Sequence, residues 1–316
     1  MSKNLKFKSL AALGLTVGAL AWNTALPKAY AQNRPSVVAT SSVICGLTKQ
    51  IAGSSIDLKC LIDAGADPHV YQPKPGDRRA IEQAKLILYS GYDFEPSLIR
   101  LIKATSNRAP KVAVAQEAVR APLQFEEDGK TVPDPHVWHN AKNGIAMARV
   151  ISRRLSQIIP SRASVYTANT RKLTAELTQI DTWIKSQIAT IPVRQRQLVT
   201  THDALGYYSK AYRIPVVGAL GGISSEEAPA PGRVATLVRA IKAAGVPTIF
   251  AETTINPKLI AAVAREAKVK VSNRELYADG LGEPGTEGAT YQGMLKANTR
   301  TIVEGLGGKY KPFRPR

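Results

Sequence analysis

The sequence predicts an α/β protein with two (βα)4-like lobes, each with a parallel sheet, joined by one long spine helix. Short β-branched runs alternate with helical patterns in both halves of the chain, which is typical of βα units. A segment between the halves has no internal proline and repeats its apolar residues with a helical period. With 316 residues the chain also exceeds the size at which one core usually stops growing.

Residues 1–31 are expected to be a secretory signal peptide. Lys3, Lys6 and Lys8 precede an apolar run, and the small-residue phrase "KAYA" ends at Ala31. The run has roughly a dozen residues, too few for a bilayer that needs about 20. No cysteine that could carry a lipid lies near the cleavage site. We therefore expect a soluble periplasmic protein with neither a lipoprotein cysteine nor stable membrane insertion.

The N-terminal lobe is expected to span 32–159. Its Cys45 and Cys60 would enclose a loop of about 15 residues. In an oxidising compartment they form either a disulfide bond or two buried thiols. The expected strands of this lobe cover 36–40, 57–62, 85–91 and 111–115.

Residues 160–192 are expected to form the long helix. Prolines occur only at its two ends, and its apolar residues recur at spacings of four, three, four and four: Leu173, Leu177, Ile180, Ile184 and Ile188. About 29 residues in a helix extend over about 43 Å, the length of a whole domain. The helix is then either a rigid spine between the lobes or an amphipathic helix of one domain.

The C-terminal lobe is expected to span 193–316 and to repeat the βα pattern. Helices are expected over 232–244 and 257–267. The residues at the C-terminal end, 309–316, are expected to be an untethered tail. The expected strands cover 197–201, 214–220, 247–252 and 268–272.

The chain is strongly basic, with a formal net charge of +19 that falls by four to +15 once the lysines of the signal are removed. The basic residues are scattered over expected helices and form no patch interleaved with aromatic residues. This distribution favours a solvated basic surface, facing anionic lipid or envelope polymers, over a nucleic-acid interface.

The chain has only four histidines, in three places. His69 lies in "ADPHVY", His136 and His139 lie in "PDPHVWHN", and His202 lies in "VTTHDALGYY". His69 and His202 each follow an expected strand, as does Asp279 in "YADGLGEPG". Ligands of parallel sheets bind beyond the carboxyl ends of the strands. The proline before His69 and His136 stiffens a turn that aims each imidazole.

Together, His69, His136, His202 and Asp279 would supply three nitrogens and a carboxylate to a dication. Four ligands complete the tetrahedral coordination of zinc and leave no position for a catalytic water. The motifs H-E-x-x-H, G-x-S-x-G and the phosphate-binding loop are absent from the sequence. This pattern predicts metal binding without catalysis, rather than a metallohydrolase, a serine hydrolase or an ATPase.

The segments "GADPHVYQPKPGDRRAIEQAKLILYSGYDFE", "DPHVWHNAKNGIAMA" and "VTTHDALGYYSKAYRI" resemble the zinc- and manganese-binding solute-binding proteins of bacterial metal ABC transporters. The resemblance covers nearly all of the mature chain. It implies a monomeric, non-enzymatic protein that delivers its cargo to a membrane permease. It also implies that His69, His136, His202 and Asp279 are the metal ligands. A histidine at position 202 is typical of zinc binders, and a glutamate there of manganese binders.

The sequence departs from this family pattern at several points. Segment 116–133 has no histidine, although many zinc-type members have a histidine-rich loop there. His139 stands where the family usually has an apolar residue. It either supports a ligand without touching the metal, or binds the metal itself, or faces solvent. Glu252 either orients a ligand or a lysine, or caps the next helix. Manganese or iron cargo, and a metal-dependent adhesin or another secreted metalloprotein, remain the alternatives.

Overall fold

The structure is a computed structural model, and it describes residues 34–127, 129–225 and 231–315. The expected signal peptide, 1–31, lies outside the described residues. Within the described part of the chain, no helix combines the length and the apolar character needed to cross a membrane.

The first half of the chain forms the predicted parallel sheet. Its strand order is β2-β1-β3-β4, and every neighbouring pair is parallel. The central strands are almost wholly apolar and buried, as in a sheet with both faces covered. The elements are β1 (Ser36–Ala39), α1 (Ser42–Ala52), β2 (Asp57–Cys60), α2 (Pro75–Gln83), β3 (Leu86–Tyr89), α3 (Pro96–Ala104), β4 (Lys111–Ala113) and α4 (Val114–Ala118).

A disulfide bond joins Cys45 in α1 to Cys60 in β2, with the two Cα atoms 5.7 Å apart. Strand β2 is the edge of the sheet and is largely exposed. The disulfide therefore ties a weakly buried edge strand to a helix of the core. Of the two alternatives left open by the sequence, the structure has the bonded one.

Replacing both cysteines with serine is expected to lower the free energy of unfolding by about 3 kcal/mol, because the bond closes a loop of about 15 residues in the unfolded chain. Urea denaturation of the oxidised protein and the Cys45→Ser/Cys60→Ser variant measures the difference. The wild-type protein under reducing conditions is the control and should lose the same amount. A variant as stable as the oxidised protein would contradict the expectation.

A β-hairpin that the sequence did not predict follows α4. Strands β5 (Gln124–Glu127) and β6 (Lys130–Pro133) pair antiparallel. Gly129 in the turn has a φ of 74°, a conformation that glycine adopts without steric cost. After the hairpin come the short 3-10 turn η1 (Val137–His139) and helix α5 (Ala141–Ile158).

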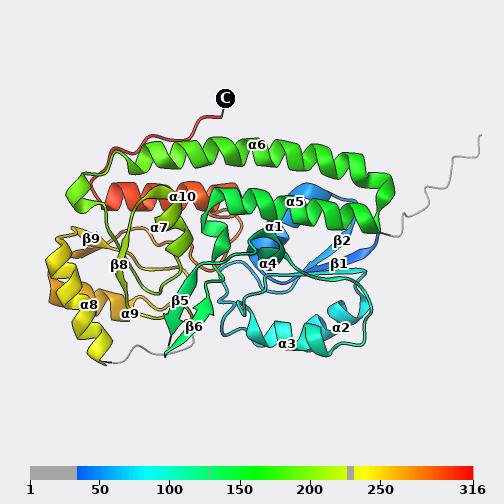
Figure 1. The fold of residues 1–316 in the computed structure, drawn as a ribbon, viewed down its shortest axis with the longest axis horizontal. Helices are drawn as coiled ribbons and strands as arrows, with labels where there is room; N and C mark the ends of the chain where they lie inside the picture. The colour runs from blue at the N-terminus through cyan, green and yellow to red at the C-terminus, as the bar shows by residue number, and fades with distance from the viewer. Residues whose placement is uncertain (1–33, 128, 226–230, 316) are drawn as a thin grey trace, which may run out of the picture. The chain divides into compact units, whose positions relative to one another are not determined.

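The predicted long helix is α6 (Ala163–Ile188), between the 3-10 turns η2 (Pro160–Arg162) and η3 (Val193–Gln195). Its 26 residues extend over about 39 Å. All five residues of the predicted apolar period are buried. The helix packs against α1 and α5 of the first half and against α10 (Tyr291–Gly305) of the second (Figure 1). A helix that contacts both halves favours the spine interpretation.

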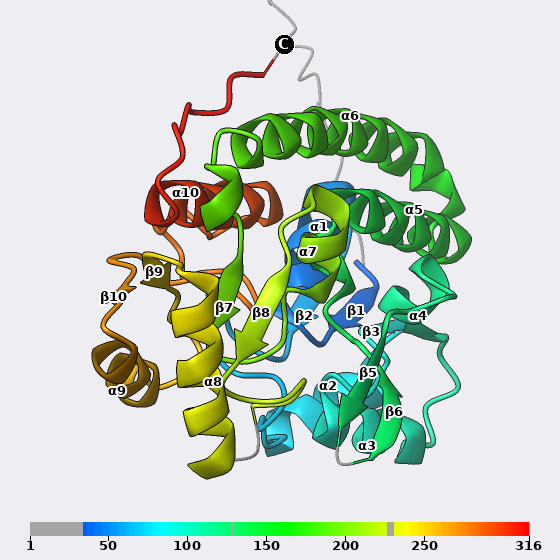
Figure 2. The ribbon, with the colours of Figure 1, turned by 60° about the vertical axis from the view of Figure 1, so that its left-hand side comes forward.

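The second half repeats the parallel pattern with shorter strands than predicted. Strands β7 and β8 form one parallel pair, and β9 and β10 form another. The amide of Phe250, just after β9, donates to the carbonyl of Val199 in β7 at 3.0 Å. Helices α8 and α9 lie beside these strands (Figure 2). The elements are β7 (Leu198–Thr200), α7 (Gly206–Tyr212), β8 (Val216–Ala219), α8 (Pro231–Ala244), β9 (Thr248–Ile249), α9 (Lys258–Ala267) and β10 (Lys270–Val271).

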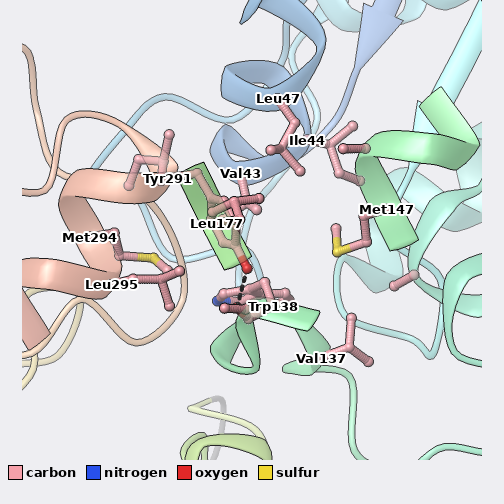
Figure 3. Packing of buried hydrophobic residues seen from close by; sticks show 14 of the residues in the cluster. Val43, Ile44, Leu47, Val137, Trp138, Met147, Leu177, Tyr291, Met294 and Leu295 are labelled. Carbon is pink, nitrogen blue, oxygen red and sulfur yellow. Dashed lines mark hydrogen bonds between the residues drawn. The ribbon is translucent and has the colours of Figure 1, made fainter. Parts of the chain in front are cut away.

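One hydrophobic cluster contains residues from both halves of the chain (Figure 3). Tyr291 at the start of α10 is fully buried, and its hydroxyl donates to the carbonyl of Trp138 at 2.6 Å. Gly144 in α5 allows this approach, because a Cβ atom there would overlap the Tyr291 ring. Tyr291 of α10 therefore packs against α5 and hydrogen-bonds to the segment that contains Trp138.

The prediction that 309–316 is an untethered tail is wrong for the described residues. The indole of Trp183 in α6 donates to the carbonyl of Lys311 at 3.0 Å, and the Lys311 amide donates to Gln187 at 2.7 Å. The rings of Tyr310 and Phe313 lie 6.0 and 5.9 Å from the Trp183 ring. Aromatic ring contacts and these hydrogen bonds hold the segment on the long helix.

Candidate metal centre

The structure brings His69, His136, His202 and Asp279 together, and each is at most 5% exposed. His69 lies in the loop after β2, and His202 is the second residue after the end of β7. His136 precedes the short turn η1, and Asp279 follows the isolated bridge between Glu252 and Leu276. The carboxyl ends of strands from both halves therefore meet at one buried cluster.

The donor atoms of the cluster have the spacing of a metal site. Asp279 Oδ1 lies 3.5 Å from His69 Nε2, 3.4 Å from His136 Nε2 and 3.1 Å from His202 Nε2. The two Nε2 atoms of His69 and His136 are 3.3 Å apart. In a regular tetrahedron with ligands at about 2.0–2.1 Å from zinc, neighbouring ligand atoms are about 3.3 Å apart. The four distances given above are all close to that value, and all four ligand atoms lie within 4.8 Å of one another.

Two atoms of the cluster have no hydrogen-bond partner among the described residues. They are His202 Nε2 and Asp279 Oδ1, and both are buried. A buried polar atom without a partner costs about 1–3 kcal/mol. A cation between the four side chains would satisfy both atoms at once.

Both Asp-Pro-His motifs form the same local hydrogen bond. The amide of His69 donates to Asp67 Oδ1 at 2.9 Å, and the amide of His136 donates to Asp134 Oδ1 at 2.9 Å. Asp134 Oδ1 also lies 2.9 Å from His136 Nδ1, so this imidazole directs its Nε2 at the cluster. Sequence reasoning assigned the stiff turn to the proline and missed the aspartates, although their fixed place two residues before each histidine was the available signal.

Glu252 holds His202. Its Oε1 accepts hydrogen bonds from the amides of Thr201 at 3.0 Å and His202 at 3.1 Å, and its Oε2 contacts His202 Nδ1. Helix α9 starts after Pro257, so Glu252 does not cap it. A carboxylate on the far nitrogen fixes the tautomer and the direction of an imidazole, which is the orienting alternative considered from the sequence.

Asp279 is held by residues that lie far apart in the sequence. The Thr254 hydroxyl donates to Asp279 Oδ2 at 2.7 Å. His139 Nε2 lies 2.7 Å from the carbonyl of Ala278, the residue before Asp279, and the Trp138 indole donates to the same carbonyl at 3.3 Å. His139 is buried beside the cluster but is not one of its four members. Thr254 had no signal in the sequence.

The charged groups shift one another's pKa values strongly. Burial opposes the charge of His202, yet the nearby Asp279 and Glu252 raise its pKa well above the ordinary value. The pKa of His136 is also raised despite burial, because the carboxylates of Asp134 and Asp279 lie next to its ring. The imidazoles hold the pKa of Asp279 well below its usual range. By contrast, burial lowers the pKa of His139 to about 3, so its ring is neutral.

Next to the cluster lies a buried carboxyl that sequence reasoning missed. The Phe94 ring lies 5.0 Å from that of His69, in an edge-to-face arrangement. The neighbouring Glu95 accepts hydrogen bonds from the Thr40 hydroxyl at 2.6 Å and the Ser90 amide at 2.7 Å. Burial outweighs these bonds and raises the pKa of Glu95 to about 7.

The Glu95→Gln variant is expected to gain stability relative to the wild-type protein as the pH rises. With a carboxyl pKa of about 7 in the folded protein, only the unfolded chain releases this proton between about pH 4.5 and 7, so the wild type loses up to about 3 kcal/mol. Urea denaturation at pH 5 and pH 8 measures the change. The exposed Glu283→Gln is the control, and a pH-independent difference for Glu95→Gln would contradict the assignment.

Two lobes of parallel strands, a long helix and a buried His3Asp cluster agree with the metal-binding class that the sequence resembles. The structure is similar to the periplasmic zinc-binding protein TroA from Treponema pallidum, with a TM-score of 0.82, 30% identity and coverage of 86% of this chain and 99% of that one. A family model described as "Zinc-uptake complex component A periplasmic" matches residues 37–305. The chain belongs to this family, which is described as a component of zinc uptake.

Relatives with different metals in their names are also similar to the chain. The manganese ABC transporter substrate-binding lipoprotein PsaA from Streptococcus mitis is 32% identical over 85% of this chain and 88% of that protein. The Fe(III)-bound structure of YtgA from Chlamydia trachomatis has a TM-score of 0.77 at 26% identity and covers 86% of this chain and 98% of that one. The chain is thus similar to proteins whose names or structure titles mention zinc, manganese or iron.

Proposed function

We propose that this protein binds one divalent cation, zinc, through His69, His136, His202 and Asp279 and delivers it to the membrane permease of an ABC transporter. The observation that carries the proposal is the set of four buried donor atoms, two of which have no other partner among the described residues. A complete set of four protein ligands suits capture of an ion, whereas a catalytic site needs an open position.

The choice of zinc rests on the nitrogen-rich donor set. Three imidazoles and one carboxylate suit zinc, and manganese prefers more oxygen ligands. The names of the similar proteins favour manganese or iron as the alternative cargo. Because zinc binds more tightly than manganese to most nitrogen sites in vitro, the metal content of protein purified from its native envelope decides. About one zinc per chain is expected, and manganese or iron in its place would overturn the choice.

Metal titration distinguishes a cargo site from a metalloenzyme and from a protein that acts without metal. Tight binding of a single ion without hydrolytic turnover is expected of a cargo site. Turnover of ester or peptide substrates by the zinc-loaded protein would favour a secreted metalloenzyme. Absence of ion binding would overturn the cargo proposal and favour an envelope protein that acts without metal.

Export without a lipid anchor is part of the proposal. The curated relatives are named as lipoproteins, but Cys45 and Cys60 are bonded to each other. The mature protein is expected to begin at Gln32, to lie in the periplasm and to be a monomer. Intact-mass spectrometry of the protein from the envelope tests this, and a mass increased by acyl chains would contradict it.

Release is proposed to involve small shifts around the site. Helix α6 contacts helices of both halves, and the proposed lobes, 32–159 and 193–316, are joined by the segment 160–192 that contains it. Such a stiff spine disfavours a wide hinge motion. Structures with and without the ion are expected to differ in the loops that carry the ligands, and a large rotation between the lobes would contradict the idea.

A further inference from the structure

A groove of about 390 Å³ lies between helices α5 and α6 and shares no lining residue with the candidate metal centre. The two helices are antiparallel neighbours (Figure 1). Three exposed arginines line the groove, Arg149 and Arg153 from α5 and Arg171 from α6. Positive charge from two helices is thus gathered along one surface.

This surface has little compensating negative charge. Residues 141–175 include seven lysines and arginines and no acidic residue. Glu117 pairs with Arg154 at 2.8 Å and lies 3.8 Å from Arg153. Neither Arg149 nor Arg171 forms an ion pair with a described carboxylate. Like charges held side by side repel one another, so the groove favours an anion.

The rest of the groove is lined by hydroxyl groups. Thr170 is only 8% exposed, and its buried Oγ1 has no hydrogen-bond partner among the described residues. On each helix the lining residues recur with spacings of three, one and three, so they form a single face. The hydroxyl-bearing residues are Ser152, Ser156, Thr167, Thr170 and Thr174.

We propose that this groove binds an oxyanion of the phosphate class. Guanidinium groups match phosphate oxygens with paired hydrogen bonds. The Ser156 and Thr174 hydroxyls already donate to carbonyls of their own helices, but the Thr170 hydroxyl has no such partner among the described residues. A bound phosphate also removes the repulsion between the arginines. The same group occurs as free phosphate and in the headgroup of an anionic lipid, which a basic envelope protein meets at the membrane surface. The inference goes beyond the proposed function and does not depend on the metal centre.

The test compares two variants that lose the same charge. Arg149→Gln/Arg171→Gln changes the groove, and Arg233→Gln/Lys242→Gln changes exposed residues of α8. Inorganic phosphate is titrated into the mature protein by calorimetry at low salt. Lipid binding is measured by sedimentation with phosphatidylglycerol vesicles. Phosphatidylcholine vesicles, which carry no net charge, are the comparison. The groove variant is expected to lose about 10-fold or more in affinity, and the α8 variant much less.

The outcomes identify the source of the phosphate group or overturn the site. Binding of free phosphate without vesicle binding assigns the site to a soluble anion, and binding of phosphatidylglycerol vesicles alone assigns it to a lipid headgroup. An equal loss in both variants shows a general charge effect and overturns the site, as does the absence of binding to either probe. Zinc titration of the same variants is expected to be unchanged, so failure here is separate from failure of the metal site.

Discussion

Replacing His202 by alanine is expected to lower zinc affinity by about 10²–10³-fold. A structural zinc site is worth about 10–16 kcal/mol, so each of four ligands contributes roughly a quarter of that free energy. The Nε2 atom of His202 is buried 3.1 Å from Asp279 Oδ1 and has no other partner among the described residues. Competition titration with a zinc chelator measures the loss.

The matched control is the other buried imidazole of this region. His139→Phe keeps an aromatic ring but removes the hydrogen bond to the carbonyl of Ala278. Because His139 acts on Asp279 only through the backbone, its loss is expected to cost about 10-fold or less. A large loss for His139→Phe together with unchanged affinity for His202→Ala would remove His202 from the proposed ligands and make His139 the alternative.

Zinc affinity is expected to fall steeply with acid, by about 100-fold for each pH unit wherever two protons are displaced. A protonated imidazole cannot bind metal, so zinc and protons compete for the same nitrogens. The pKa values of His202 and His136 are both raised by neighbouring carboxylates, which extends this competition toward neutral pH. The pKa of Asp279 is lowered, so its carboxylate stays ionised over the same range.

Calorimetry in buffers of different ionisation enthalpy counts the protons released. At pH 7 the release of at least one proton per zinc is expected, and no release would contradict the raised pKa of His202. Glu252→Gln is the informative variant, because the charge of Glu252 helps to raise that pKa. In this variant the fall in affinity should begin at a lower pH than in the wild-type protein.

Two features of the fold were not predicted from the sequence. They are the hairpin of β5 and β6 and the attachment of the C-terminal segment. The hairpin lies in a stretch that sequence reasoning assigned to no element, and its turn depends on Gly129. The segment around Lys311 was expected to be free because its composition is that of a tail. Its position depends on Trp183, which lies more than a hundred residues earlier in the chain.

The sequence by itself determined the eight parallel strands, the long helix and the candidate residues at the ends of the strands, because these follow from short periods and neighbouring residues. Only the tertiary structure decided how the candidates meet. It placed Glu252 on His202, Thr254 on Asp279 and His139 behind Ala278. These contacts join residues 25 to 139 positions apart, and no local pattern encodes them. The chain must fold before the buried charges can shift one another's pKa values.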